Sequence, residues 1–250
     1  MSKNELPVNA LGADIAPLTN VALCMSTLHR AINRPRHLPG IVIMYGPSGY
    51  GKSTAASVAT IRTEACYVQA RSSWTRKAAL QAILKGLGVA AGKTMSEMTD
   101  QIAEELALSG RPLIIDEIDY LVEKGTIELV RDIYEASQAP ILLIGEEGVP
   151  AKLKRWERMH GRVLDWCPAQ PASLDDAKLL AALHLEKVTI ADDLLARVYE
   201  LSAGSVRRIC VNLSRIEEEC RLYGMDAVDL AAWGGRELYT GEAPNRRRLQ

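Results

Sequence analysis

The residues best suited to chemistry form segment 46–53, Gly-Pro-Ser-Gly-Tyr-Gly-Lys-Ser, which fits the pattern G-x-x-x-x-G-K-[ST] and directly follows an apolar run. Gly46 and Gly51 allow the backbone to curl until its N–H groups face phosphate oxygens at the positive end of the next helix. We expect Lys52 to reach the β- and γ-phosphates of ATP, and Ser53 to offer its hydroxyl to Mg²⁺. The predicted nucleotide-binding residues are Gly46, Pro47, Ser48, Gly49, Tyr50, Gly51, Lys52, Ser53 and Thr54.

Two adjacent carboxylates, Asp116 and Glu117, end a second apolar run over residues 113–115. At the end of a strand, Asp116 could hold Mg²⁺ through its water shell, and Glu117 could polarise the water that attacks the γ-phosphate. An Asp-Glu pair alone is a weak signal, because carboxylates often cap loops. Together with the phosphate-binding loop it predicts an ATPase, with Lys52 and Glu117 as catalytic residues and Ser53 and Asp116 as metal-binding residues. Asp119 continues the acidic cluster without an assigned role.

Strand and helix patterns alternate along the chain as far as residue 168. A first helix is predicted over 18–32 and a basic helix over 152–162, and the strands are predicted at 41–45, 65–69, 113–117, 140–144 and 163–166. This alternation predicts an α/β fold in which a parallel sheet is sandwiched by helices. Ligands bind at the carboxyl ends of such strands, which is where Gly46, Asp116 and Gly145 fall.

Strand signals stop at Ser173, and only helical patterns follow, at 174–185, 192–201, 206–222 and 226–233. They predict a small all-helical C-terminal domain. The domains expected are an N-terminal extension and helix over 1–39, an α/β nucleotide-binding core over 40–168, a helical domain over 169–235 and a basic flexible tail over 236–250.

The composition is that of an ordinary globular protein of 250 residues, with 48% hydrophobic and 24% charged residues. Its five cysteines are odd in number and form no C-x-x-C pair, which argues against a disulfide framework or a zinc site. Because no long apolar run or secretory signal is present, we expect a cytoplasmic protein. The net charge of −1 means that any contact with nucleic acid must come from local basic clusters.

Two basic clusters each allow two interpretations. Segment 71–77 contains Arg71, Arg76 and Lys77 around Trp74, and is either a solvated loop or a surface that neutralises nucleic-acid phosphates, with Lys124 as a weaker addition. The three consecutive arginines 246–248 near the end of the chain are either a solubilising tail or a docking site.

With the phosphate-binding loop, Asp116-Glu117 and the lid motif Gly204-Ser205-Val206-Arg207, the chain resembles the AAA+ ATPases over residues 15–233. The resemblance implies that Arg207 is the sensor 2 residue, which reaches the γ-phosphate. The sensor 1 position follows the fourth strand and is usually Asn or Thr, whereas here Gly145 is followed by Glu146. An arginine finger precedes the fifth strand in this family and acts on the neighbouring subunit; Arg162 matches it best and Arg158 second.

Within AAA+, the strand Tyr67-Val68-Gln69 with its basic continuation and the run 142–146 resemble the target-selecting ATPases of transposition. These are the B protein of Mu-like phages and the TnsC and TniB proteins. The resemblance implies an ATP-dependent homo-oligomer that forms helical filaments on duplex DNA and delivers it to a transposase, with hydrolysis driving disassembly. A separate N-terminal helix-turn-helix domain is not expected, so the core alone would bind DNA.

Two other functions fit the same motifs. One is a helicase-loader-like ATPase that acts on a replicative protein ring, and the other is an ATPase component of secretion machinery. A secretion ATPase normally carries a membrane segment or a peptidoglycan-binding domain. This function is less favoured, because neither feature is expected from the sequence.

Overall fold

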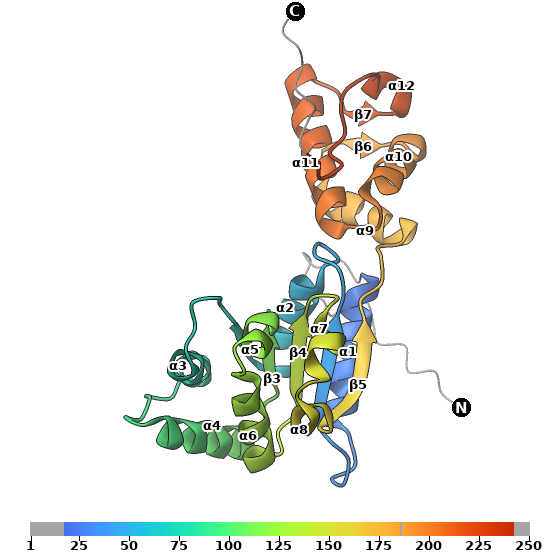
Figure 1. Cartoon of the computed structure of the whole chain (residues 1–250). Helices are drawn as coiled ribbons and strands as arrows, with labels where there is room; N and C mark the ends of the chain where they lie inside the picture. The colour runs from blue at the N-terminus through green and yellow to red at the C-terminus, as the bar shows by residue number, and fades with distance from the viewer. Residues whose placement is uncertain (1–17, 186, 243–250) are drawn as a thin grey trace, which may run out of the picture. The chain divides into compact units, whose positions relative to one another are not determined.

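The computed structural model describes residues 18–185 and 187–242, which form two units (Figure 1). One unit contains residues 20–169, and the other joins residues 18–19 to residues 170–242. The predictions for the first seventeen residues and for Arg246, Arg247 and Arg248 lie outside the described residues. No helix in the described ranges has the length and apolarity needed to cross a lipid bilayer.

The larger unit is built on a five-stranded parallel sheet with strand order β2-β3-β4-β1-β5. The strands are β1 (Ile41–Tyr45), β2 (Cys66–Gln69), β3 (Leu113–Asp116), β4 (Ile141–Gly145) and β5 (Val163–Pro168). In register, Ile41 of β1 lies beside Ile141 of β4 and Val163 of β5. The sheet is therefore parallel as predicted, and the carboxyl ends of its strands share one edge.

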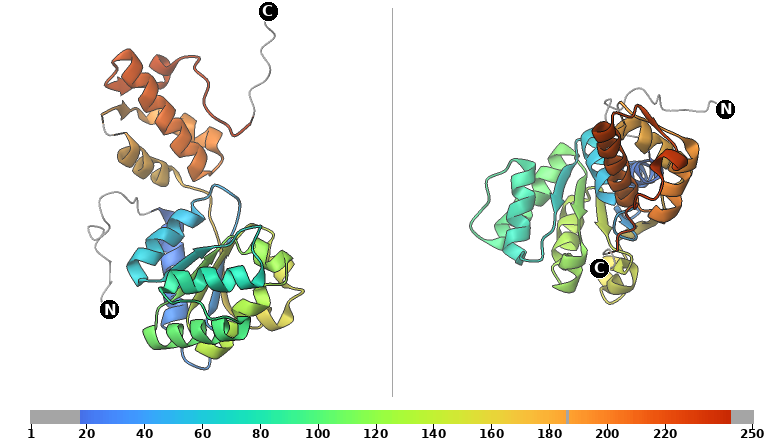
Figure 2. Two further views of the ribbon diagram at one scale, coloured as in Figure 1. Left: turned by 90° about the vertical axis from the view of Figure 1, so that its left-hand side faces the viewer. Right: turned by 90° about the horizontal axis from the view of Figure 1, so that it is seen from above.

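Helices cover both faces of this sheet, and its central strands β1, β3 and β4 are accordingly buried at nearly every position. Ile43, Ile115 and Leu143 share one core cluster with residues of α3, α4 and α6. Buried residues of α1 and α2 fall outside that cluster, and Figure 2 shows the yellow-green helices α6 to α8 on the opposite side of the sheet from these two blue helices. The helices of this unit are α1 (Thr19–Ile32), α2 (Lys52–Thr63), α3 (Arg76–Leu87), α4 (Met95–Ser109), α5 (Asp119–Glu123), α6 (Ile127–Ser137), α7 (Val149–Leu153) and α8 (Glu157–His160).

The single basic helix predicted over 152–162 is wrong, because the segment forms α7 and α8 with a break between them. Trp156 leaves helical geometry at φ −106° and ψ 66°. Its ring packs against the core and lies so close to Gly125 that a Cβ there would meet it at 3.0 Å. Arg155 donates to the Val122 carbonyl at 3.0 Å. These tertiary contacts outweigh the helical tendency of the sequence. Helix α5 was not predicted.

The C-terminal unit is helical apart from one short pair of strands, β6 (Thr189–Ile190) and β7 (Ala227–Val228), which run parallel. The prediction of an all-helical unit missed this pair. The helix predicted over 226–233 is reduced to α12 (Leu230–Trp233), because the Thr189 N–H bonds the Asp226 carbonyl and extends the chain there. The remaining helices are α9 (Leu174–His184), α10 (Asp192–Ser202) and α11 (Val206–Tyr223).

Candidate nucleotide-binding site

The loop between β1 and α2 has the backbone geometry of a phosphate cradle. Gly49 and Gly51 have φ values of 86° and 82°, in the left-handed region that favours glycine. Gly51 precedes the first residue of α2, and its carbonyl accepts the first helical hydrogen bond from Ala55 N–H at 2.9 Å. The loop therefore opens into a helix N-terminus, where free N–H groups favour an anion.

Lys52 lies folded onto this loop. Its Nζ donates to the Gly46 carbonyl at 2.7 Å and to the Pro47 carbonyl at 2.9 Å. Burial lowers the pKa of Lys52, and the nearby carboxylates, Asp116 first among them, act in the opposite direction. The ammonium is thus held over the loop by neutral acceptors, which phosphate oxygens can replace with stronger, charge-assisted hydrogen bonds.

Helix α1 supports the loop through Asn20, a contact that the sequence did not indicate. Asn20 is 4% exposed, and its Nδ2 donates to the Tyr50 carbonyl at 2.8 Å. A buried amide that satisfies a loop carbonyl limits the conformations open to that loop. The helix before the sheet therefore helps to shape the cradle.

Asp116 is held in one orientation at the end of β3, where it is 2% exposed. Its Oδ1 accepts from the Glu117 N–H at 2.8 Å and its Oδ2 from the Tyr67 hydroxyl at 3.1 Å. Carboxylate and hydroxyl oxygens are the ligands that Mg²⁺ prefers, so Asp116 and Ser53 fit this ion. In the described part of the chain no group of three or more His, Cys, Asp or Glu residues is placed to hold a metal. A Mg²⁺ ion at Asp116 and Ser53 would need further oxygen ligands, such as those of a nucleotide and water.

Tyr67→Phe is expected to raise the Mg²⁺ concentration needed for nucleotide binding by roughly 10-fold or more, the usual effect of losing a partner of a metal ligand. Phenylalanine keeps the ring but removes the donor to Asp116 Oδ2. Titration of an ATP analogue at a series of Mg²⁺ concentrations measures the change. Tyr120→Phe, at a half-exposed tyrosine of α5, is the matched control. Equal Mg²⁺ dependence in the two variants would contradict this role for Tyr67.

Glu117 has a left-handed backbone, with φ 58°, although it is not glycine. Such a conformation costs about 1–3 kcal/mol and tends to occur at functional sites. Burial raises the pKa of Glu117, followed by the charges of Asp116 and Glu146, while Lys52 lowers it. A carboxylate with a raised pKa is a better proton acceptor, which suits general-base chemistry.

Asp119, which had no predicted role, joins the end of β4 to the helix that follows β3. It is 5% exposed; its Oδ2 accepts from the Glu146 N–H at 2.7 Å, and its Oδ1 pairs with Lys152 Nζ at 3.0 Å. A Cβ on Gly145 would meet Asp119 Oδ2 at 2.7 Å, so glycine is required for this close approach. The contact fixes the backbone at the predicted sensor 1 position and leaves the Glu146 side chain exposed.

The two candidate arginine fingers lie away from the loop of their own chain. Arg162 directly precedes β5, and its carbonyl accepts from the Ile41 N–H at 3.3 Å, so it sits at the amino edge of the sheet. A strand of this length rises roughly 15 Å at about 3.3 Å per residue, which separates that edge from the loop. Arg158, in α8, lines the same cavity of about 460 Å³ as Arg162. Any action of either arginine on a nucleotide therefore has to be on another protomer. Arg207 is in α11 of the other unit, and its sensor 2 role stays a prediction.

The predicted DNA-contact residues follow β2, at the same sheet edge as the loop. Arg71, Arg76 and Lys77 are exposed. Lys124 donates to the carbonyls of Ser72 and Trp74, so it fastens this segment, and its direct contact with DNA stays a prediction. Trp74 is partly buried against the core, which leaves less of its ring for stacking on a base.

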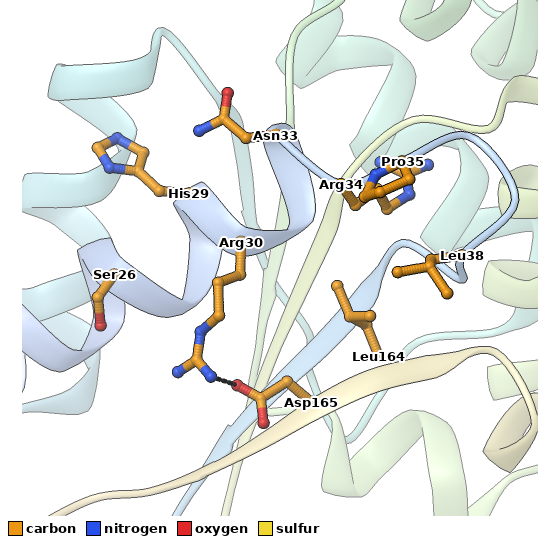
Figure 3. Close-up of a pocket in the computed structure, with 9 residues that line it drawn as sticks. All are labelled: Ser26, His29, Arg30, Asn33, Arg34, Pro35, Leu38, Leu164 and Asp165. Carbon is orange, nitrogen blue, oxygen red and sulfur yellow. Dashed lines mark ion pairs between the residues drawn. The ribbon is translucent and has the colours of Figure 1, made fainter.

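A separate cavity of about 720 Å³ lies beside the end of α1 and the start of β5 (Figure 3). Arg30 pairs with Asp165 at 2.8 Å, and Arg34 donates to the carbonyls of Ala31 and Gln138, at 2.6 Å each. Arg30 and Arg34, which line the cavity, thus form contacts within the unit. We assign the cavity no part in nucleotide binding.

Comparisons with known proteins agree with this architecture. A protein-family model described as an AAA domain matches residues 36–153. None of the curated proteins matches the chain. The Orc1 protein of Aeropyrum pernix, solved in complex with DNA, has a TM-score of 0.64 and 20% identity, covering 84% of this chain and 61% of its own. Cdc6p from Pyrobaculum aerophilum has a TM-score of 0.61 and 14% identity, covering 91% and 66%.

The chain therefore spans less than two thirds of the length of these two proteins, and at such identities the likeness is one of fold. The structural similarity covers most of this chain and therefore extends beyond the segment that the family model matches. Residues 36–153 thus match the model of an AAA domain, and the whole chain, a parallel α/β core followed by C-terminal helices, is similar in fold to these two proteins.

Proposed function

We propose that this protein is a Mg²⁺-dependent ATPase that assembles on DNA. The observation that carries the ATPase proposal is the convergence of Lys52, Asp116 and Glu117 at one edge of the sheet. Each charge in this group influences the pKa of another: Asp116 and Glu117 both raise that of Lys52, and Lys52 lowers that of Glu117. Such mutual dependence is typical of groups arranged around a shared ligand.

In the proposed reaction, the loop N–H groups and Lys52 bind the β- and γ-phosphates. Asp116 and Ser53 would hold Mg²⁺, which would neutralise charge on the phosphate oxygens. Glu117 accepts a proton from the water that attacks the γ-phosphorus, and the bond from that phosphorus to the bridging oxygen of ADP breaks. Asp119 and Tyr67 position this machinery without touching the reacting atoms.

The arginine that completes the site comes from a neighbouring protomer in this proposal. Arg162 is favoured, because it directly precedes β5 at the edge of the sheet opposite its own loop. An arginine supplied in this way stabilises charge that develops only in the transition state. Hydrolysis therefore depends on assembly, and turnover per protomer should rise with protein concentration.

The proposed DNA surface is the exposed segment with Arg71, Arg76 and Lys77. A chain with net charge −1 cannot hold DNA by a general field, so a small cluster has to be repeated by assembly. The DNA complex of the structurally similar Orc1 protein lends support to a nucleic-acid partner for this fold. We further propose, from the resemblance to transposition ATPases, that the oligomer is a helical filament that delivers duplex DNA to a transposase.

Changing Arg76 and Lys77 together to Ala is expected to weaken binding alike on unrelated duplexes. If each protomer loses two phosphate contacts, the slope of log affinity against log salt should fall by about two per protomer. Filter binding or anisotropy at several salt concentrations measures the slope. The control removes Arg62 and Lys85, two other exposed cations of the same unit. An unchanged slope in the Arg76/Lys77 variant would exclude this surface.

Electron microscopy of the protein with an ATP analogue, with and without duplex DNA, tests the assembly. Filaments that form on DNA only with the analogue would support the transposition-type function. A stable complex with a replicative helicase, and no filament, would favour the helicase-loader alternative instead.

A further inference from the structure

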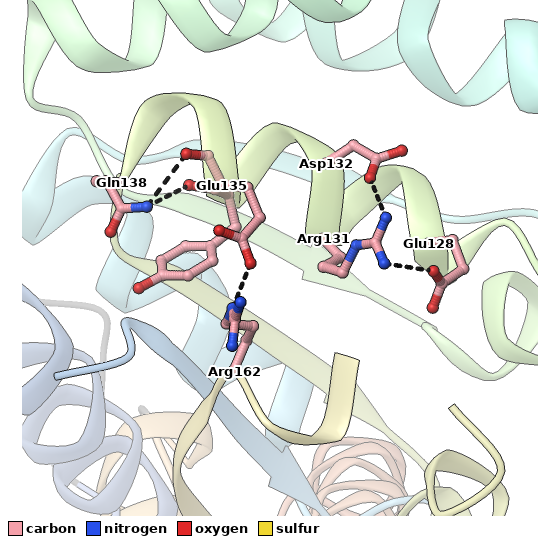
Figure 4. Close-up of polar contacts among 7 residues, drawn as sticks. Glu128, Arg131, Asp132, Glu135, Gln138 and Arg162 are labelled. Carbon is pink, nitrogen blue, oxygen red and sulfur yellow. Dashed lines mark hydrogen bonds and ion pairs between the residues drawn. The ribbon is translucent and has the colours of Figure 1, made fainter. Parts of the chain in front are cut away.

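Helix α6 carries three carboxylates, and only one of them contacts the candidate arginine finger. Glu128 and Asp132 both pair with Arg131, at 3.0 Å and 2.5 Å, within the helix itself. Glu135 points the other way and pairs with Arg162, which directly precedes β5 (Figure 4). The contact joins residues 27 positions apart in sequence, so the fold rather than the helix repeat creates it.

This ion pair is one that can be exchanged. The Arg162 and Glu135 side chains are 45% and 41% exposed. Pairs in such positions stabilise a protein by only about 0–1 kcal/mol, because water competes for both partners. A multiply charged phosphate bound by a second protomer could therefore replace Glu135 as the partner of Arg162 at a small cost in free energy.

The cavity around the pair does not by itself attract an anion. It is lined by the charged residues Arg131, Arg158, Arg162, Asp132, Glu135 and Glu157, so its charges balance. With Glu135 in place, the carboxylate both occupies Arg162 and repels an approaching phosphate. A nucleotide diphosphate offers more charge and more acceptor oxygens than one carboxylate does. The γ-phosphate of a triphosphate adds further charge and further acceptor oxygens.

We propose that Glu135 is a positioning residue that holds Arg162 inside its own protomer until the γ-phosphate bound by a neighbour displaces it. This proposal rests on the proposed trans-acting role of Arg162 and concerns the regulation of the same site. Glu135 biases productive contact between protomers toward the triphosphate, because the more highly charged ligand competes better with the carboxylate for Arg162.

The test compares Glu135→Gln with Glu128→Gln, a matched loss of one carboxylate on the same helix. Turnover and analogue-dependent association, the latter by sedimentation velocity, are measured over a range of protein concentrations. Glu135→Gln is expected to lower the concentration for half-maximal turnover and association roughly 2- to 5-fold, the range that a surface pair allows. Glu128→Gln should leave both near wild type.

Arg162→Ala, alone and combined with Glu135→Gln, distinguishes a failure of the arginine-finger assignment from a failure of the holding role of Glu135. In the Arg162→Ala background the Glu135 change should have no effect on either readout. If Arg162→Ala abolishes turnover but Glu135→Gln behaves like Glu128→Gln, the holding role of Glu135 is overturned and the finger stands. If Arg162→Ala keeps full turnover, both the finger and the holding role fail.

Discussion

Lys52→Ala is expected to abolish measurable binding of ATP. The lysine ammonium is the charged donor of the loop, and it lies within hydrogen-bond distance of two loop carbonyls, at 2.7 and 2.9 Å. Alanine would remove the charge-assisted bonds to the phosphates and also leave those carbonyls without this donor. Equilibrium titration with a fluorescent ATP analogue measures the loss.

Two controls make the Lys52 result specific. Lys85→Ala removes an exposed lysine from α3 and should bind the analogue normally. Thermal unfolding of the Lys52 variant should show an intact core, because the buried strands do not depend on the loop. Wild-type affinity in Lys52→Ala would contradict the assignment of the loop as a nucleotide cradle.

Glu117→Gln is expected to keep nucleotide binding and to lower turnover by about 10²- to 10⁴-fold, the usual contribution of a general base. Glutamine has the same shape but cannot accept the proton. It also tolerates the required backbone, since Gln138 in the same chain has φ 54°. Phosphate release beside equilibrium titration separates turnover from binding. Glu147→Gln, at an exposed glutamate nearby, should leave both unchanged. Normal turnover in Glu117→Gln would remove it from the mechanism.

The sheet and its loop could be predicted from sequence because each depends on residues that are close together in the chain. Each buried strand is a short apolar run, and the loop motif stands directly between a strand and a helix. The break between α7 and α8 could not be predicted, because the packing of Trp156 against Gly125 decides it. The two-residue strands β6 and β7 are too short to produce a periodic pattern, and they exist only through pairing with each other.

The supporting residues of the site escaped prediction for a related reason. Asn20, Tyr67 and Asp119 act on partners 30, 49 and 27 positions away in sequence. None of the three belongs to the phosphate-binding loop or to the Asp116-Glu117 pair, and each gains its role from the way the fold brings distant chain segments to one edge of the sheet. The motif residues themselves, such as Lys52 and Asp116, could be identified because their spacing reflects contact with a ligand rather than with the rest of the chain.

Mixing Arg162→Ala with Lys52→Ala protomers is expected to restore activity that neither variant has alone. Arg162→Ala should lower turnover by about 10³- to 10⁵-fold, as loss of an arginine finger does in other phosphate-transferring enzymes. Its nucleotide pocket stays intact, because Arg162 lies at the opposite sheet edge. Lys52→Ala protomers lack the pocket but still present Arg162. Where the pocket of an Arg162→Ala protomer faces Arg162 of a Lys52→Ala protomer, one complete site forms.

The expected recovery follows from counting interfaces. In an equal mixture that assembles at random, about a quarter of the interfaces join an intact pocket to an intact arginine, so turnover should return to about a quarter of the wild-type rate. Phosphate release as a function of the mixing ratio measures it, with a maximum at equal amounts. Arg158→Ala mixed with Lys52→Ala is the matched comparison, because Arg158 lines the same cavity. If only that second mixture recovers activity, Arg158 is the finger, and the ion pair between Arg162 and Glu135 serves the fold of a single protomer.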